Sequence, residues 1–199
     1  MLFLFLRKAK EVLLCFFNNL LNSLLDCDIM YLIKTIKVSE RVMKIMFVCH
    51  GNICRSPMAE FIFMNMVYEK RMGCRFSVSS SATSDEEIIS GVGNPVYPPA
   101  KAELKKHGIS CEGKYAVQLK REDYENYDLF VGMDSANIRN MHIIFGGDPD
   151  GKIHKLLSYT GSDRDVADPW YSGRFDVAYK DIYDGCKALF ASLATNTFC

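Results

Sequence analysis

The chain has 199 residues, 49% of them hydrophobic, and its 24 basic and 24 acidic side chains balance to a formal net charge of zero. This length suits one domain with a sizeable core, while the balanced charge provides no general field for binding nucleic acid or an anionic membrane. The eight cysteines follow no regular paired spacing, which favours a reducing, cytoplasmic setting over a disulfide-rich secreted scaffold.

Residues 1–42 do not share the pattern of strands and helices that follows. An apolar face at helical spacing lies opposite several asparagines and comprises Leu13, Phe17, Leu20, Leu21 and Leu24. This face is typical of an amphipathic interfacial helix, yet the segment is too polar to span a bilayer and lacks the charge order of a signal peptide. We interpret it as an N-terminal extension included by a mis-assigned start, with the domain covering residues 43–199.

A strand, a tight loop and a helix start follow one another directly. The run Lys44–Val48 is almost wholly apolar, which predicts a strand buried on both faces of a parallel sheet. Pro57 suits the first position of a helix, and an apolar-rich segment continues to Gly73. The backbone amides of Gly51–Arg55 can turn inward between them, and the positive end of the helix adds to their field. The segment therefore predicts an anion-binding loop.

The side chains of this loop indicate its chemistry. The amides, the helix dipole and Arg55 all favour a thiolate at Cys49, so this sulfur should be nucleophilic at neutral pH. The planar guanidinium of Arg55 can hold two oxygens of a phosphoryl group, as a lysine cannot. Gly51 and Asn52 readily adopt the left-handed backbone of a tight loop. Ser56 can either cap the helix or donate its hydroxyl to the thiolate.

Three further loop residues have alternative roles. Ile53 is apolar, which suits a phenyl ring beside the anion loop. His50 can tune the thiolate or face solvent, and we expect it to face solvent. Cys54 should lie near Cys49, where a reversible disulfide would protect the nucleophile from irreversible oxidation, although a small packing residue would also suit the position.

The remainder of the chain predicts alternating strands and helices. Strands are expected at 75–81, 127–133 and 152–158, and helices at 100–107, 135–145 and 176–194. The loop 82–99, rich in Gly and Pro, should border the anion site. This order predicts a three-layer α/β domain with a four-stranded parallel sheet, helices on both faces, and the ligand at the C-terminal end of the first strand.

A carboxyl group is the second requirement of a thiol that attacks phosphorus, because the leaving oxygen needs a proton and a water later needs a base. Asp168 fits, since the proline after it favours an extended backbone. Trp170 and Tyr171 beside it can form an apolar wall for an aryl leaving group. From the residues alone, Asp163 and Asp165 are alternatives.

The segment Cys49–Glu60, CHGNICRSPMAE, resembles the signature of the low-molecular-weight protein tyrosine phosphatases. The segments Gly93–Ala100 and Asp168–Tyr171 are similar to the bacterial branch of that family, and the similarity runs from about Met43 to the C-terminal helix. The resemblance implies catalytic roles for Cys49, Arg55 and Asp168, and a redox role for Cys54. Expected substrate-binding residues are His50, Gly51, Asn52, Ile53, Cys54, Ser56, Trp170 and Tyr171.

The resemblance implies a cysteine-dependent phosphoric monoester hydrolase that forms a phosphocysteine and releases inorganic phosphate. No metal or other cofactor is expected, because the four histidines follow no ligand spacing. Its partners would be phosphotyrosine proteins, with a bacterial tyrosine kinase as a candidate and no nucleic acid or membrane span. In the family, a threonine at the position of Ile53 marks phosphoarginine specificity, so the isoleucine favours phosphotyrosine.

Four alternatives to this interpretation are considered from the sequence. Bacterial relatives also act in polysaccharide export, and a protein arginine phosphatase is a second possibility. A thioredoxin-coupled arsenate reductase would need further cysteines downstream, yet the segment 114–130 has none, and Cys111, Cys186 and Cys199 are widely spaced. A phosphate-binding module without turnover is disfavoured because Cys49, Arg55 and Asp168 are all present.

Overall fold

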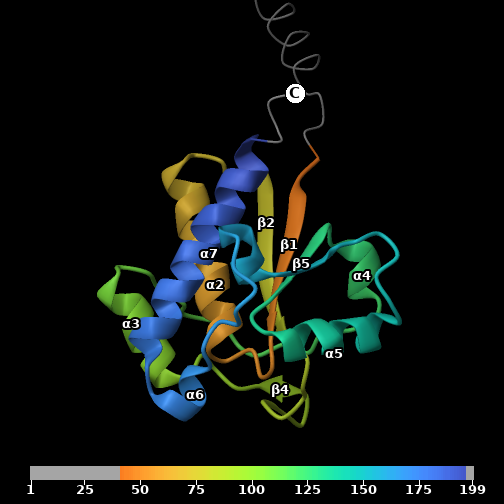
Figure 1. Cartoon of the computed structure of the whole chain (residues 1–199). Helices are drawn as coiled ribbons and strands as arrows, with labels where there is room; N and C mark the ends of the chain where they lie inside the picture. Colours follow the sequence, from red (N-terminus) through yellow and green to blue (C-terminus); the bar gives the residue numbers. More distant parts are fainter. Residues whose placement is uncertain (1–40, 196–199) are drawn as a thin grey trace, which may run out of the picture. The chain divides into compact units, whose positions relative to one another are not determined.

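The computed structural model of the chain describes residues 41–195, of which residues 42–195 form one compact unit (Figure 1). The expected apolar face at Leu13–Leu24 lies outside the described residues.

The core of this unit is a four-stranded parallel sheet. Its strands are β1 (Met43–Cys49), β2 (Phe76–Ala82), β5 (Leu129–Gly132) and β6 (Ile153–Lys155), in the spatial order β2-β1-β5-β6. β1 pairs with β2 along its whole length and with β5 over four residues, so it lies at the centre. The predicted four-stranded parallel sheet is confirmed, with β1 ending at Cys49.

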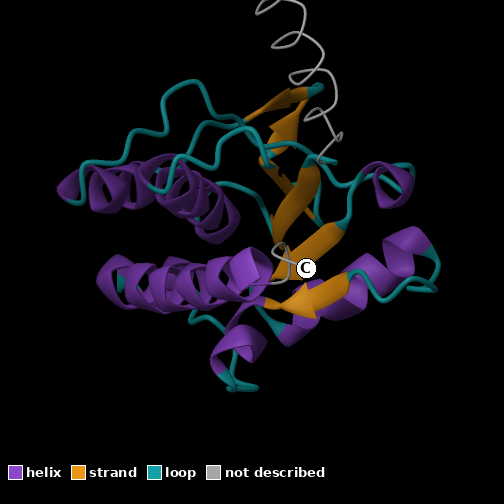
Figure 2. Cartoon of the chain, turned by 90° about the horizontal axis from the view of Figure 1, so that it is seen from above, coloured by secondary structure: helices purple, strands orange, loops and turns teal. Residues whose placement is uncertain are grey.

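Helices cover both faces of the sheet (Figure 2). The helices on one face share a single apolar cluster with it, and those on the other face share a second cluster. The first group comprises α2 (Arg55–Glu69), α3 (Pro98–Lys106) and α7 (Phe175–Thr195). The second group comprises α4 (Asp123–Asn126) and α5 (Ser135–Phe145). The expected three-layer arrangement is therefore confirmed.

The apolar run in β1 follows from this double coverage. Ile45 and Phe47 belong to the cluster under α2 and α7, whereas Met46 and Val48 belong to the cluster under α4 and α5. Successive side chains of a strand point to opposite faces, so both sets must be apolar. The alternation continues to Cys49, which lies on the α2 side where the strand ends.

Two short elements lie in segments that we expected to be irregular. A hairpin of β3 (Ile88–Ile89) and β4 (Val92–Gly93) occupies the middle of the predicted loop. The segment after Asp168 forms one helical turn, α6 (Pro169–Ser172), and Asp168 itself has the extended backbone that its following proline favours. Figure 1 shows β4 and α6 at the lower end of the molecule, toward which β1 runs.

The predicted strand 152–158 is wrong in its second half. After β6 the chain forms a 3-10 helix, η1 (Leu156–Thr160). Leu156 and Leu157 are consecutive and both buried, in the cluster that includes α7. A strand would direct only one of them to that face, whereas a helical turn can bury both.

Candidate active site

The loop between β1 and α2 has the predicted left-handed residue at Asn52, whose φ is +56°. Gly51 has no positive φ, so our conformational argument for this glycine is wrong. A Cβ at Gly51 would lie 2.9 Å from the Cγ of Glu87. The position is therefore restricted by the close approach of a neighbouring side chain rather than by its own backbone angle.

The Cys49 sulfur is buried and receives polar contacts from within the loop. Ser56 Oγ lies 2.9 Å from Sγ, and the amide of Asn52 donates to Sγ at 3.3 Å. The N-terminal cap of α2 is Cys54, with no side-chain hydrogen bond. Of the two roles considered for Ser56, the geometry therefore supports contact with the sulfur rather than capping.

A buried hydrogen-bond network holds this serine from behind. The Nδ2 of Asn52 donates to Ser56 Oγ at 2.9 Å and to Ser80 Oγ at 2.8 Å. Ser80 in turn donates to Glu60 at 2.5 Å, and Glu60 pairs with Lys114 at 2.9 Å. Because Ser56 accepts the amide proton of Asn52, its own hydroxyl proton goes either to the sulfur at 2.9 Å or to the backbone oxygen of Ser81 at 3.4 Å, and the shorter contact favours the sulfur. Nothing in the sequence indicated that Ser80 and Lys114 belong to this network, because both lie in segments distant from the loop.

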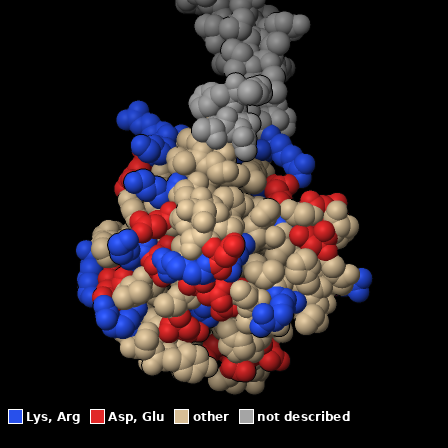
Figure 3. All heavy atoms as spheres, viewed as in Figure 1, with Lys and Arg blue, Asp and Glu red and all other residues tan. Residues whose placement is uncertain are grey.

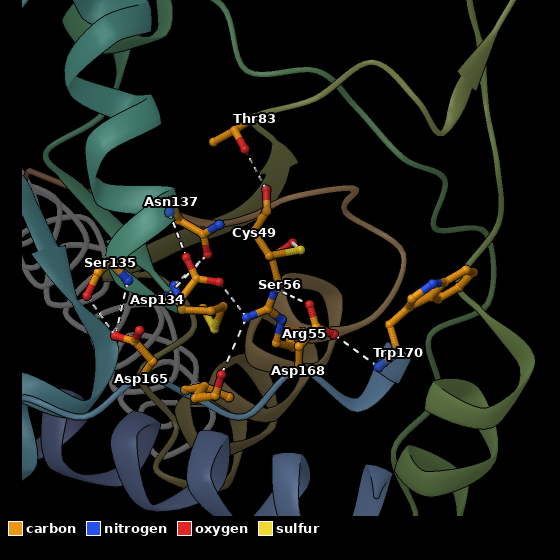
Figure 4. Close-up of polar contacts among 12 residues, drawn as sticks. Cys49, Arg55, Ser56, Thr83, Asp134, Ser135, Asn137, Asp165, Asp168 and Trp170 are labelled. Carbon is orange, nitrogen blue, oxygen red and sulfur yellow. Dashed lines mark hydrogen bonds and ion pairs between the residues drawn. The ribbon is translucent and has the colours of Figure 1, made fainter. Parts of the chain in front are cut away.

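Arg55 is held by two carboxylates (Figure 4). Nη1 donates to Asp134 at 2.7 Å, and Nη2 donates to Asp168 at 2.7 Å. Burial opposes the positive charge, but the nearby Cys49 and the two carboxylates together raise the pKa of Arg55 above its usual value. The guanidinium therefore stays charged, with a fixed orientation at the end of β1.

Asp134 is a site residue that the sequence analysis missed. It directly precedes the helix predicted at 135–145, and it caps α5 by accepting from the amide of Asn137 at 2.7 Å. Its other oxygen binds Arg55. The sequence pattern indicated only the helix cap, because Arg55, the second partner, lies 79 residues away in the chain.

The structure distinguishes the three candidate aspartates. Asp168 caps α6 by accepting from the amide of Trp170 at 3.0 Å, while its second oxygen binds Arg55. Asp165 instead accepts from Ser135 and pairs with Lys155, and the backbone oxygen of Asp163 also accepts from Lys155. Asp168 is thus the one of the three that lies against Arg55 and lines the cavity.

A cavity of about 160 Å³ opens at this point. Its lining comprises Cys49, His50, Gly51, Ile53, Cys54, Arg55, Glu86, Glu87, Asp168, Trp170 and Tyr171. Nine of the eleven predicted site residues are in this set. The other two, Asn52 and Ser56, are fully buried, so they support the loop rather than line its mouth.

The mouth of the cavity is formed by more exposed groups. Trp170 is 52% exposed and its ring lies 5.0 Å from that of Tyr97, whereas Tyr171 is 89% exposed. His50 faces solvent as expected, with Nε2 3.1 Å from Glu86. The loop 82–99 borders the cavity as expected, because Glu86 and Glu87 contribute to its lining. The sequence analysis did not identify these two glutamates as site residues.

Cys54 differs from Cys49 in its chemistry. Burial, and then the charges of Cys49 and Asp168, raise the pKa of Cys54 to about 12. Cys54 is therefore a neutral thiol near pH 7, and the structure records both cysteines as free.

The described residues offer neither a metal cluster nor a membrane-spanning helix. Within residues 41–195, no cluster of three His, Cys, Asp or Glu side chains is arranged to hold a metal ion. In the same part of the chain, no helix has the length and apolar character needed to cross a bilayer.

Known proteins share this sequence pattern. A family model described as low molecular weight phosphotyrosine protein phosphatase matches residues 44–197. The low molecular weight protein-tyrosine-phosphatase YfkJ of Bacillus subtilis is 35% identical over 154 residues, which cover 76% of this chain and 96% of that protein. The low molecular weight phosphotyrosine protein phosphatase of Gallus gallus is 33% identical over 152 residues, which cover 74% and 93%.

Solved structures share the fold as well. The crystal structure of YfkJ aligns with a TM-score of 0.74 at 34% identity and covers 78% of this chain and 97% of that one. A Drosophila arginine phosphatase aligns with a TM-score of 0.68 at 28% identity and covers 76% and 98%. The resemblance inferred from Cys49–Glu60 is confirmed: the chain belongs to the low molecular weight phosphotyrosine protein phosphatase family and is a hydrolase of that family.

Proposed function

We propose that this family member hydrolyses phosphotyrosine in proteins through a phosphocysteine on Cys49, with Arg55 binding the phosphoryl group and Asp168 acting first as acid and then as base. One observation carries the proposal: the Cys49 sulfur, the Arg55 guanidinium and the Asp168 carboxylate meet at one small cavity. Together they supply a nucleophile, an anion-binding group and a proton donor, which are what this reaction requires.

Substrate binding exchanges one partner of Arg55. A phosphoryl dianion in the cavity competes with Asp168 for Nη2, since both offer charged oxygens to the same donor. Asp134 keeps its hold on Nη1 because its position is fixed by the cap of α5. The exchange frees the Asp168 carboxyl to face the leaving oxygen, while Arg55 keeps its orientation.

The first chemical step transfers the phosphoryl group to sulfur. The Cys49 thiolate attacks phosphorus in line, the S–P bond forms and the bond from phosphorus to the tyrosine oxygen breaks. Asp168 in its acid form gives its proton to that oxygen. Arg55 and the loop amides hold the equatorial oxygens and stabilise a loose transition state. Ser56 and the amide of Asn52, directed at Sγ, stabilise the thiolate before attack and again when it leaves.

The second step releases phosphate. Water attacks the phosphorus of the phosphocysteine, and Asp168, now a carboxylate, accepts its proton. The S–P bond breaks, inorganic phosphate forms and the thiolate of Cys49 is restored. The same aspartate thus serves both steps and ends in the acid form needed for the next turnover.

The preference for an aryl phosphate rests on the apolar part of the lining. Ile53 is almost buried beside the anion loop, and Trp170 stands at the mouth with its ring supported by Tyr97. A phenyl ring can pack between such surfaces, whereas a phosphoserine would leave them uncovered. The same argument favours phosphotyrosine over phosphoarginine, whose guanidinium carries polar N–H groups.

The cysteines bear on the alternative reaction and on the setting. Cys111 and Cys186 are 4% and 0% exposed, so neither is available to carry a disulfide outward from Cys49, as an arsenate reductase requires. We propose a reducing cytoplasmic compartment, in which the thiolate persists. A disulfide between Cys49 and Cys54, formed under oxidation and reversed by thiols, would protect the Cys49 sulfur from irreversible oxidation.

Steady-state kinetics of the full chain test this proposal. Phosphotyrosine, phosphoarginine and phosphoserine peptides of matched sequence are compared, and we expect the first to exceed the others in kcat/KM by about 10²-fold. Acid quenching during turnover should trap phosphate on the Cys49 peptide. Equal rates on all three peptides would contradict the specificity, a preference for phosphoarginine would support the arginine phosphatase, and arsenate-dependent oxidation of thioredoxin would support the reductase.

A further inference from the structure

Carboxylates surround the mouth of a cavity whose floor binds an anion. Glu86 and Glu87 come from the turn between β2 and the β3–β4 hairpin, directly after Asp85, and both line the cavity. We call Glu86 and Glu87 the acidic rim. In Figure 3, acidic side chains lie along the lowest edge of the face, the end at which Figure 1 places β4 and α6.

Glu87 is held in place by two features. Its Oε2 accepts from Asn94 Nδ2 at 2.7 Å, and its Cγ would lie 2.9 Å from a Cβ at Gly51, so a side chain there would displace it. Its charge is also among the influences that raise the pKa of Cys54, after burial and the charges of Cys49 and Asp168. Glu87 therefore presents a fixed negative charge to the anion loop from the side of the hairpin.

The Glu86 side chain is less restrained than that of Glu87. It is 70% exposed, and one of its oxygens lies 3.1 Å from Nε2 of the half-exposed His50 ring. Among the described residues that line the cavity, Arg55 is the single lysine or arginine, and a bound phosphoryl group occupies it. The charge that remains at the mouth is therefore negative, although the net charge of the whole chain is zero.

We propose that the acidic rim selects phosphotyrosine sites that carry lysine or arginine next to the phosphorylated residue, and disfavours sites flanked by aspartate or glutamate. This inference rests on the proposed function, because it concerns the peptide around the same phosphotyrosine. With the phosphate on the floor and the ring between Ile53 and Trp170, the neighbouring residues of the substrate lie over the mouth. A cation there meets Glu86 and Glu87, whereas an anion is repelled by them.

The expected effect is modest, because the rim is exposed. One favourable charge pair in such a position changes kcat/KM by about two- to fivefold. Exchanging a flanking lysine for a glutamate combines attraction and repulsion, so the ratio of the two peptides should be about tenfold. Salt screens exposed charges, and the ratio should fall toward one at high ionic strength.

The test uses the full chain and three phosphotyrosine peptides that differ only beside the phosphotyrosine, with lysine, alanine or glutamate. Because the readout is a ratio of kcat/KM values, it is independent of any change in overall activity. We expect the order lysine, alanine, glutamate for the unaltered protein. The double variant E86Q/E87Q keeps the side-chain shape and the acceptor for Asn94, and its ratio should be close to one. Glu86→Lys combined with Glu87→Gln makes the rim net positive and should invert the order.

A matched control removes the same charge elsewhere. Glu125 is exposed on α4, which covers the opposite face of the sheet, and Glu125→Gln should keep the full peptide ratio. A lysine-to-glutamate peptide ratio near one in the unaltered protein at low salt, or an unchanged ratio in the double variant, would overturn the proposed role of the acidic rim. p-Nitrophenyl phosphate has no flanking residues, so failure to hydrolyse it and all three peptides would overturn the proposed function instead.

Discussion

The floor and the mouth of the cavity are built on different principles. On the floor, Cys49, Asn52, Arg55 and Ser56 are at most 4% exposed and each has at least two polar contacts inside the protein. At the mouth, Glu86, Trp170 and Tyr171 are more than half exposed. Buried networks act in a low dielectric and lose much when one member is removed, whereas exposed groups are screened by water and salt. Reaction chemistry should therefore depend on the floor, and substrate choice on the mouth.

The largest effect expected from this comparison is at the nucleophile. Cys49→Ser should lower kcat on p-nitrophenyl phosphate by at least about 10⁴-fold, because serine is a far weaker nucleophile than a thiolate. The exposed Cys74 provides the matched control, and Cys74→Ser should keep full activity. Full hydrolysis by the Cys49 variant would exclude a phosphocysteine mechanism.

The next effect compares the aspartates. Asp168→Asn should lower kcat on phosphotyrosine peptides by about 10²- to 10⁴-fold, the range of general acid–base catalysis. The loss should be smaller for aryl phosphates with more acidic phenols, since such leaving groups need less protonation. Asp165→Asn is the control, because Asp165 pairs with Lys155 instead of Arg55, and should change kcat little. The reverse ranking of the two variants would assign the acid to Asp165.

A third prediction concerns two thiols of the same loop. Burial, with the charges of Cys49 and Asp168, raises the pKa of Cys54 to about 12, so this acid stays protonated from pH 6 to 8. Since alkylation requires the thiolate, iodoacetamide at pH 7 should modify Cys49 while leaving Cys54 unmodified. Peptide mass mapping over time measures both rates, and inorganic phosphate should protect Cys49. Comparable labelling of Cys54 would show that the floor is more open than the structure indicates.

The fourth prediction tests a positioning residue. Asp134→Asn can still cap α5 but removes one negative partner of Arg55. We expect kcat to fall about tenfold from poorer positioning, without a rise in KM, because the site becomes more positive toward a phosphate. Steady-state kinetics separate the two parameters, and thermal unfolding checks that the fold is kept. A raised KM with unchanged kcat would mean that Asp134 contributes to binding alone.

The smallest effects on kcat/KM are expected from changes to the acidic rim, and only these should depend strongly on salt.

Several features were predictable because their signals are local. The apolar run at β1 predicts a central strand, since Ile45 and Met46 point to opposite covered faces. The spacing of Cys49, Asn52, Arg55 and Pro57 lies within one loop and one helix turn, so the anion site could be located from neighbouring residues. The α5 helix was predicted with its observed bounds, because Asp134 caps its start and Gly146 ends it.

Other features depend on partners that are distant in sequence. Ser80 joins the loop network through Asn52, and Lys114 joins it through Glu60, yet no local pattern links either residue to the loop. Asp134 displays the ordinary signal of a helix cap, which conceals its contact with Arg55. Leu156 and Leu157 form a helical turn because both are buried, and a single sequence does not show which surface lies above them.

The sequence by itself therefore determined the alternating architecture, the anion loop with its thiol and guanidinium, and the family. These depend on periodicity and on residues adjacent in the chain. Only the tertiary structure decided that Ser56 contacts the sulfur, that two carboxylates clamp Arg55, that Asp168 lies against it while Asp165 does not, and that glutamates border the mouth. The physical reason is the same in each case: hydrogen bonds and charge pairs act over a few ångströms, and the parallel sheet brings the ends of distant strands within that range.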